Sequence, residues 1–354
     1  MTSPQSFSLR PLLPEDSHKY GKLIEESPDT GAVRVSQRFE IDPHEAVINV
    51  HPGSVGVVAE TPGYNGLIGA GLVRLGRVQW EGQDVPYALL NTLVVHSDFR
   101  RRGVASQLAK WREEHALQHF GGEDGVTFAI IQKNNIGSEL TAKNWMRQFL
   151  SDRLVVIPMK MRSKPPVKMS EYVVIEISPN EMEEAVAGQN RFYKNFNLYP
   201  TETAESLSHW RSETPFDTPY HHYFVVTDRS GNILGGLGLT EYYKLRKLIA
   251  THIPPMLEFL NIFLKALPKD RIMRELGMSR IWFADGHFKA AQYLFETMRW
   301  EWRDKATSIM CFTDTRSPVM EIYNLRPWTI KSMGGVALRA PTEMPEDHLV
   351  YYAF

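Results

Sequence analysis

The most constraining feature of this sequence is an apolar segment that leads through a polar turn into a basic loop containing a glycine, and then into a helix. The apolar segment is residues 93–95, and the loop carries the pattern Arg100-x-x-Gly103-x-Ala105. Backbone N–H groups at the start of a helix form a concavity that binds anions, and the helix dipole adds positive potential there. Glycine lets the backbone approach the anion, and arginines add charge-assisted hydrogen bonds. The sequence therefore predicts a diphosphate site.

This segment resembles motif A of the GNAT acyltransferases, in which R/Q-x-x-G-x-G/A follows a strand and binds the pyrophosphate of coenzyme A. Three consecutive arginines are also compatible with a solvated basic turn or a nucleic-acid patch. We favour coenzyme A because strand, loop and helix occur in the required order. The resemblance implies that the cosubstrate contacts Leu93, Val94, Val95, Arg100, Arg101, Arg102, Gly103, Val104 and Ala105.

A second helix opens after the apolar residues 126–132, with the pattern Asn135-x-x-Ser138. This spacing is similar to a second GNAT signature, Asn-x-x-Ala/Ser beside coenzyme A, which implies that Asn135 binds the cosubstrate. The same residue types form ordinary Asx turns and helix N-caps. Both interpretations remain open.

The expected acid–base residues of the family are absent. Many GNAT enzymes carry a tyrosine on this second helix to protonate the departing thiolate, and a glutamate on the strand before the loop as general base. The matching positions here are Thr141 or Ala142, and residues 91–92. The resemblance further implies that the backbone N–H of Val94 or Val95 polarises the thioester carbonyl.

Several other residues are candidates for chemistry. Thr92 is the strand position best suited to contact substrate or water, although a β-branched residue also suits an ordinary strand. His96, Asp98, Glu60 and Glu40 are candidate bases by residue type alone, since geometry decides which group acts. The catalytic candidates that we retain are Thr92, His96, Ser138 and Phe354.

Phe354 is included because the chain ends in an apolar, aromatic segment, residues 349–354. Burying such side chains is favourable, so we expect this tail to dock on the protein. Docking in a cleft would place the free α-carboxylate of Phe354 where a base is missing. The alternative is that Tyr351 and Phe354 only anchor the last strand.

Composition narrows the remaining possibilities. A chain of 354 residues suits two domains, and its net charge of −1 gives no general case for nucleic acid or for an acidic membrane. The single cysteine, Cys311, excludes an internal disulfide. We find no signal peptide and no run long enough to span a bilayer, so we expect a cytoplasmic protein.

The histidine pairs do not indicate a metal site. His221 and His222 are adjacent and would face opposite ways on a strand. His115 and His119 could share a helix face but lack the glutamate of an H-E-x-x-H pattern. We expect no metal.

The second half of the chain repeats the order of elements in the first. Residues 163–168 are polar and proline-containing and indicate a linker, after which strands are expected at 172–177, 223–228, 233–239 and 281–284. The stretch that we align with the diphosphate loop, residues 265–277, lacks the pattern. We therefore expect an α+β fold with two tandem GNAT-like domains, residues 1–165 with the coenzyme A loop and residues 166–354 without it. Each should be a mixed, mostly antiparallel sheet flanked by helices.

A tandem chain with one loop-bearing half resembles the plant Hookless proteins and their bacterial relatives. The resemblance also rests on the tail residues 326–329 and 334–336. It implies transfer of an acetyl group from acetyl-coenzyme A to an amine, on a small molecule or a peptide. The alternative is an acyl-coenzyme A-binding regulatory protein with little turnover, which the missing tyrosine and glutamate favour.

Overall fold

The computed structural model describes residues 6–27, 34–51, 53–255, 267–327 and 329–352, together with residues 258 and 261. The helices in these residues are α1 (Ser17–Glu25), α2 (Val104–Phe120), α3 (Ile136–Ala142), α4 (Met182–Phe192), α5 (Ala204–Ser212), α6 (Tyr242–Leu245) and α8 (Phe288–Glu301). The strands are β1 (Ser8–Pro11), β2 (Arg34–Phe39), β3 (Ser54–Glu60), β4 (Gly69–Trp80), β5 (Gln83–Val95), β6 (Val126–Gln132), β7 (Gln148–Lys160), β8 (Val173–Glu176), β9 (Phe196–Asn197), β10 (His221–Thr227), β11 (Ile233–Thr240), β12 (Arg246–His252), β13 (Ile272–Met273), β14 (Glu275–Phe283), β15 (Ser308–Asp314), β16 (Ser332–Arg339) and β17 (Leu349–Val350). The short turns η1 (Pro14–Asp16), η3 (Ser97–Phe99), η4 (Pro179–Glu181) and η5 (Pro318–Glu321) are 3-10 helical, and η2 (Glu45–Asn49) is a π turn.

Within the described residues, twelve strands form one sheet in the order β1-β3-β4-β5-β6-β16-β7-β15-β14-β11-β10-β8. Most neighbours are antiparallel, while β5 with β6 and β14 with β15 are parallel. The expected α+β class and the two GNAT-like halves are confirmed. The two halves share one continuous sheet, because β7 pairs with β16 on one side and with β15 on the other.

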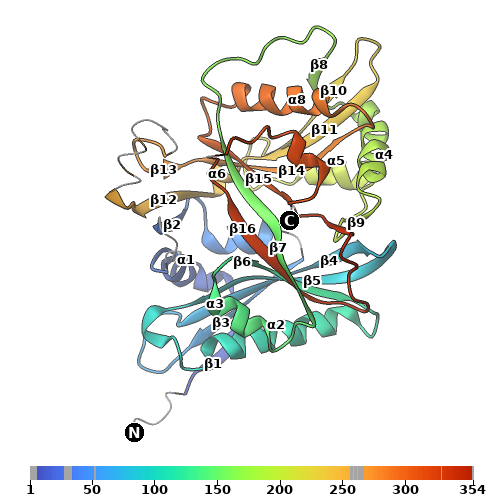
Figure 1. Ribbon diagram of the computed structural model, residues 1–354. Helices are drawn as coiled ribbons and strands as arrows, with labels where there is room; N and C mark the ends of the chain where they lie inside the picture. Colours follow the sequence, from blue (N-terminus) through green and yellow to red (C-terminus); the bar gives the residue numbers. More distant parts are fainter. Residues whose placement is uncertain are drawn as a thin grey trace.

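The C-terminal strand β16 crosses back into the first half. It lies between β6 and β7, so the first half takes one of its sheet strands from the end of the chain. In Figure 1, β7 and β16 cross the middle of the molecule between the two halves. The domain boundary at residue 165 falls after β7 and stays a prediction.

Helices cover both faces of the sheet in each half. In the first half, α2 packs its apolar side against one face, with Leu108 and Ala116 fully buried there. The other face is covered by α1, through Tyr20 and Leu23. In the second half, α8 covers one face and α4 with α5 the other. The helices α2 and α8 lie at opposite ends of the molecule in Figure 1.

The parallel pairs correct one alignment made from the sequence. In the first half α2 connects β5 to β6, and in the second half α8 connects β14 to β15. The counterpart of the diphosphate loop is therefore the turn at residues 284–287, not the stretch 265–277. That turn carries Asp285 and no arginine, so the difference between the halves remains.

Two further segments connect the halves. The strand β12 of the second half pairs with β2 of the first, and β13 extends that small sheet. Near the C-terminus, β17 pairs in parallel with β9. None of the helices within the described ranges is long and apolar enough to cross a bilayer.

Candidate functional site

The strands β5 and β6 separate at the centre of the first half. Their parallel pairing covers only residues 87–89 of β5 and 126–128 of β6. Beyond that point β5 continues along β4 to Val95, while β6 continues along β16 to Gln132. The edge of β5 from residue 90 onward is therefore open on the side facing β6.

The register shows which backbone groups point into this opening. Val94 lies opposite Ala70, and the N–H of His96 donates to the carbonyl of Ile68 at 3.0 Å. Antiparallel strands alternate between bonded and non-bonded pairs, so the N–H of Val94 points toward β4. The N–H groups of Leu93 and Val95 point the other way, into the opening. Of the two predicted carbonyl-polarising donors, Val95 fits this geometry and Val94 does not.

A β-bulge at Thr92 shapes the start of this edge. Gly71 lies opposite Leu93 and Leu72 opposite Asn91, so Thr92 has no partner on β4. Its φ is +40°, in the left-handed region, which costs a β-branched residue energy. The N–H of Thr92 is bound by its neighbour's side chain, Asn91 Oδ1, at 2.9 Å.

The basic loop closes the far end of the opening. Gly103 has a φ of +82° at the N-cap of α2, and a Cβ built there would meet nothing within 4 Å. Arg100 Nε donates to the carbonyl of Val95 at 3.1 Å, which ties the loop to the edge of β5. Arg101 is exposed in the left-handed region, and the Arg102 guanidinium lies over the ring of Phe99 at 5.2 Å.

The helix behind the loop is fixed by packing. Val104 is buried against β4, where a Cβ on Gly69 would come within 3.0 Å of Val104 Cγ1. Ala105 is half-buried, and the next turn begins with Gln107 donating to the carbonyl of Gly103. The start of α2 therefore offers open space and free N–H directions to an anion, as the sequence pattern predicts.

The remaining sequence candidates lie around this centre. His96 caps the turn η3, accepting the N–H of Asp98 at 3.4 Å, and its ring packs against Tyr64 and Phe99. Asn135 caps α3, its Oδ1 accepting the N–H of Ser138 at 3.2 Å. The N-cap interpretation of Asn135 is thus observed, and its contact with coenzyme A stays a prediction.

Two of the candidate bases are held in ion pairs. Glu60 accepts hydrogen bonds from Arg10, which lower the pKa of that carboxyl. Burial acts to raise the pKa of Glu40, but hydrogen bonds from Lys247 and Arg38 prevail and lower it. A carboxylate stabilised in this way is a weak base.

A cluster that sequence reasoning missed lies between the halves. Arg74 of β4 donates to Nδ1 of His51 at 3.0 Å, and His221 of β10 and Arg246 of β12 interact electrostatically with the same histidine. Burial, together with these charges, lowers the pKa of His51 to about 3. His51 as a whole residue is half-buried. The sequence signal that could have found this cluster is Arg74, a charged residue within the otherwise apolar run 72–75.

Burial also lowers the pKa of His221 to about 3, and its Nδ1 lies 2.9 Å from Thr240 Oγ1. Both histidines are therefore neutral at pH 7. Glu213, which follows α5, faces Arg74 and Arg280, and burial raises the pKa of its carboxyl. The cluster thus combines two neutral imidazoles, arginines, and a carboxyl group whose pKa is shifted toward neutrality.

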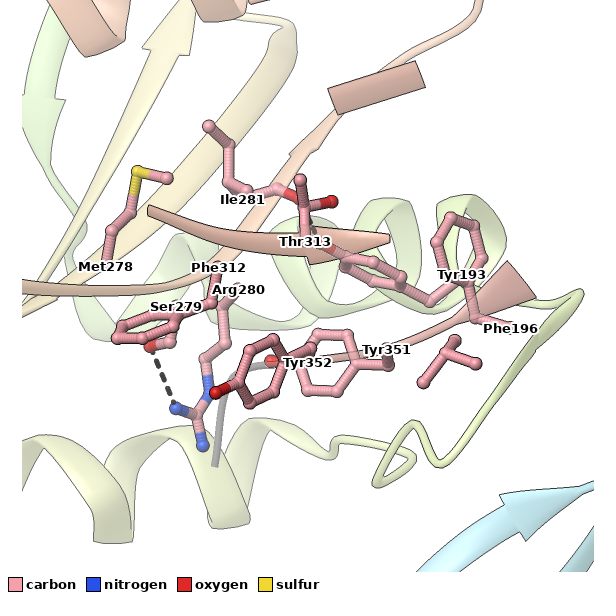
Figure 2. A pocket seen from close by; sticks show the side chains of 11 residues that line it. Tyr193, Phe196, Met278, Ser279, Arg280, Ile281, Phe312, Thr313, Tyr351 and Tyr352 are labelled. Atoms are coloured by element: carbon pink, nitrogen blue, oxygen red, sulfur yellow. Dashed lines mark hydrogen bonds between the residues drawn. The ribbon is translucent and has the colours of Figure 1, made fainter. Parts of the chain in front are cut away.

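The C-terminal segment docks beside this cluster, as expected. Tyr351 is buried, donates its N–H to the carbonyl of Asn197 at 2.8 Å, and packs its ring on Tyr193 and Tyr199. Figure 2 shows Tyr351 and Tyr352 lining a narrow pocket with Arg280. Phe354, the predicted carboxylate donor, lies outside the described residues.

Residues 24–142 match the model of the acetyltransferase (GNAT) family. The chain contains a GNAT domain. This domain includes the separated strands, the bulge and the basic loop. Within the described residues, no group of three or more metal-ligating side chains gathers in or around it.

Solved structures share this fold over most of the chain. N-myristoyltransferase of Saccharomyces cerevisiae with bound myristoyl-CoA is 11% identical, with a TM-score of 0.64 over 95% of this chain and 83% of that one. A GCN5-related N-acetyltransferase from Sphaerobacter thermophilus is 14% identical, with a TM-score of 0.57 over 95% and 96%. A tandem GNAT protein from the clavulanic acid biosynthesis pathway is 12% identical, with a TM-score of 0.55 over 96% and 100%.

The search of curated proteins found no match to this sequence. The resemblance to Hookless proteins stays a prediction. At these identities the solved structures show the fold alone, so the acyl group and the acceptor are matters of proposal.

Proposed function

We propose that this protein is an acyl-coenzyme A-dependent N-acyltransferase that moves an acetyl group from acetyl-coenzyme A to an amine. The observation that carries the proposal is the opening between β5 and β6, which starts at the Thr92 bulge and ends at the Arg100–Gly103 loop. One thioester cosubstrate could lie along this edge, with its diphosphate at the loop and its carbonyl near the bulge. The fold shared with N-myristoyltransferase, whose structure holds bound myristoyl-CoA, supports an acyl-coenzyme A as cosubstrate.

The transfer needs little from side chains on the donor side. The amine nitrogen attacks the thioester carbon, the carbonyl oxygen gains negative charge, and the C–S bond then breaks to release the thiolate. Backbone N–H groups of Leu93 and Val95 point into the opening and are free to bind the pantetheine or the carbonyl. Thr92, His96 and Ser138 remain proposed contributors to proton transfer.

The acceptor would approach from the cluster between the halves. Arg74 lies three residues after Gly71 on β4, so its side chain is on the sheet face opposite α2. Glu213, with its raised pKa, is the carboxyl of this cluster best suited to take a proton from an ammonium acceptor. In this proposal, Glu213 of the second half takes the place of the general-base glutamate that many GNAT enzymes carry before the loop.

The test is turnover with a panel of amines, including amino acids, peptides, polyamines and amino sugars, and with acetyl-, butyryl- and myristoyl-coenzyme A. Released thiol is followed spectroscopically, and coenzyme A binding is measured separately by calorimetry. Release that depends on both donor and amine supports the proposal. Tight binding of coenzyme A without thiol release from any pair favours the regulatory alternative. Thr141 also supports that alternative, because its hydroxyl already donates to the carbonyl of Gly137 at 2.8 Å. Failure to bind coenzyme A would refute both.

A further inference from the structure

One arginine lies in the apolar face of α2 directly beneath the bulge. The buried residues of this helix are Val104, Leu108, Ala109, Arg112, Ala116 and Phe120. Arg112 is the charged member of that set and is only 4% exposed. A buried guanidinium is costly unless it is paired, so its presence at this position requires an explanation.

The contacts of Arg112 lead to the bulge. Its Nη1 donates to the backbone carbonyl of Asn91 at 2.9 Å. Its Nε is buried without a hydrogen-bond partner, and no carboxylate of the described residues lies within 4.0 Å of it. Burial lowers the pKa of Arg112 to about 10, so the side chain still carries its positive charge at neutral pH. The site therefore holds an uncompensated positive charge.

The sheet makes room for this side chain. A Cβ on Gly71 would lie 3.0 Å from Arg112 Cδ and 3.3 Å from Nε. Gly71 is also the residue opposite Leu93, immediately beside the bulge. A glycine on β4 and an arginine on α2 thus form a matched pair at the one point of β5 where the ladder is interrupted.

The contact of Arg112 with the Asn91 carbonyl also sets the direction of the Thr92 N–H. The carbonyl of Asn91 and the N–H of Thr92 belong to the same trans peptide and point in opposite directions. Arg112 holds the carbonyl end from the α2 face, so the N–H end is directed away from α2. The N–H end is bound by Asn91 Oδ1 at 2.9 Å, so Arg112 and the Asn91 side chain hold the two ends of this peptide and fix its orientation.

We propose that Arg112 is a positioning residue for acyl transfer, which fixes the bulged Asn91–Thr92 peptide and supplies positive charge near the oxygen of the thioester carbonyl. This inference rests on the proposed function. The oxygen gains negative charge when the amine attacks, and it loses that charge when the C–S bond breaks. Arg112 gains and loses no proton in either step. Its contribution is electrostatic and is larger for the transition state than for the bound thioester.

The first test compares Arg112→Met, which keeps the apolar length, with Arg112→Lys, which keeps the charge. We expect Arg112→Met to lower kcat roughly 10- to 100-fold, with KM for acetyl-coenzyme A and the affinity for coenzyme A changed less than about threefold. Arg112→Lys should restore part of kcat. The control is Arg162→Met, which removes a partly buried arginine that contacts Glu296 on α8, far from the bulge. A kcat for Arg112→Met equal to that of the control would overturn the proposal.

A second measurement needs no acceptor and no turnover. The infrared carbonyl stretch of acetyl-coenzyme A labelled with ¹³C at the carbonyl should move to lower frequency on binding to the unchanged protein. It should move less in Arg112→Met. Gly71→Ala displaces the guanidinium while keeping its charge, so it should also reduce this shift. This variant replaces Arg112→Met in the test if Arg112→Met does not fold. If the shift is the same in all these proteins, Arg112 has no role at the carbonyl. If the shift changes as expected but no amine is acylated, the proposed transfer fails, while the electrostatic effect of Arg112 on the bound carbonyl stands.

Discussion

Gly103 and Gly286 occupy corresponding places in the two halves, each with a left-handed backbone at the start of the helix that links two parallel strands. Their φ angles are +82° and +77°, and a Cβ built on either would meet nothing within 4 Å. Gly103 is the N-cap of α2, while Gly286 precedes the N-cap of α8 by one residue. A left-handed glycine at the start of the helix is therefore present in both halves, while the arginines before it are present only in the first.

This pair allows the binding role of Gly103 to be separated from its conformational role. Gly103→Ala and Gly286→Ala should each cost about 1 kcal/mol of unfolding free energy, because alanine disfavours positive φ. Only Gly103→Ala, and more strongly Gly103→Val, should weaken coenzyme A binding, since the added carbon lies where the diphosphate would approach. Calorimetric titration of the two alanine variants measures this. Equal affinities in both would contradict the loop assignment.

The arginines of the loop should contribute through charge. Arg100→Ala and Arg102→Ala are each expected to weaken coenzyme A binding by roughly 1–3 kcal/mol, as for charge-assisted hydrogen bonds. Their effects should shrink as salt is raised. Lys110→Ala is the control, because Lys110 is exposed on the same helix and pairs with Glu114. If both arginine variants bind like the unchanged protein and the control, the loop does not hold the diphosphate.

The difference between the halves also predicts stoichiometry. One coenzyme A should bind per chain, because the turn before α8 has Asp285 where the first half has arginines, and a carboxylate repels a diphosphate. Native mass spectrometry or calorimetry gives the ratio directly. Two equivalent sites per chain would show that the second half binds the cosubstrate without the motif.

The strand, the glycine turn and the helix at residues 93–105 could be predicted because they are contiguous in the sequence, whereas their binding of a diphosphate stays a prediction. Contacts between distant segments could not be predicted. The insertion of β16 between β6 and β7 depends on pairing residues about 200 positions apart in the chain, which no local pattern encodes. The contact between His51 and Arg74 depends on the turn after η2 folding over β4. The false alignment of residues 265–277 has the same origin, since only strand pairing identifies α8 as the counterpart of α2.

Because His51 and His221 are neutral in the folded chain, we expect the free energy of unfolding to fall at acidic pH. His51 and His221 have pKa values lowered from 6.5 to about 3 in the folded chain, so between these limits the unfolded state binds more protons. Stability should therefore rise with pH from about 3 to 6.5, by at most about 1.4 kcal/mol per pH unit for each histidine. Denaturant unfolding at several pH values between 6.5 and 5 measures this slope. His51→Gln should reduce the slope, whereas His119→Gln, on the exposed face of α2, should leave it unchanged.

A deletion of the last two residues tests whether the C-terminal carboxylate takes part in the transfer. Tyr351 is anchored by its N–H bond to Asn197 and by ring contacts with Tyr193 and Tyr199, so removing Ala353 and Phe354 should leave the tail docked and the fold intact. The α-carboxylate would then move to Tyr352, away from the place it takes in the full chain. If that carboxylate is the base of the transfer, kcat should fall at least 10-fold while coenzyme A affinity and the unfolding midpoint stay unchanged. Phe354→Ala is the control, because it removes the ring and keeps the carboxylate at its position. Full turnover in the shortened chain would show that the tail serves packing alone.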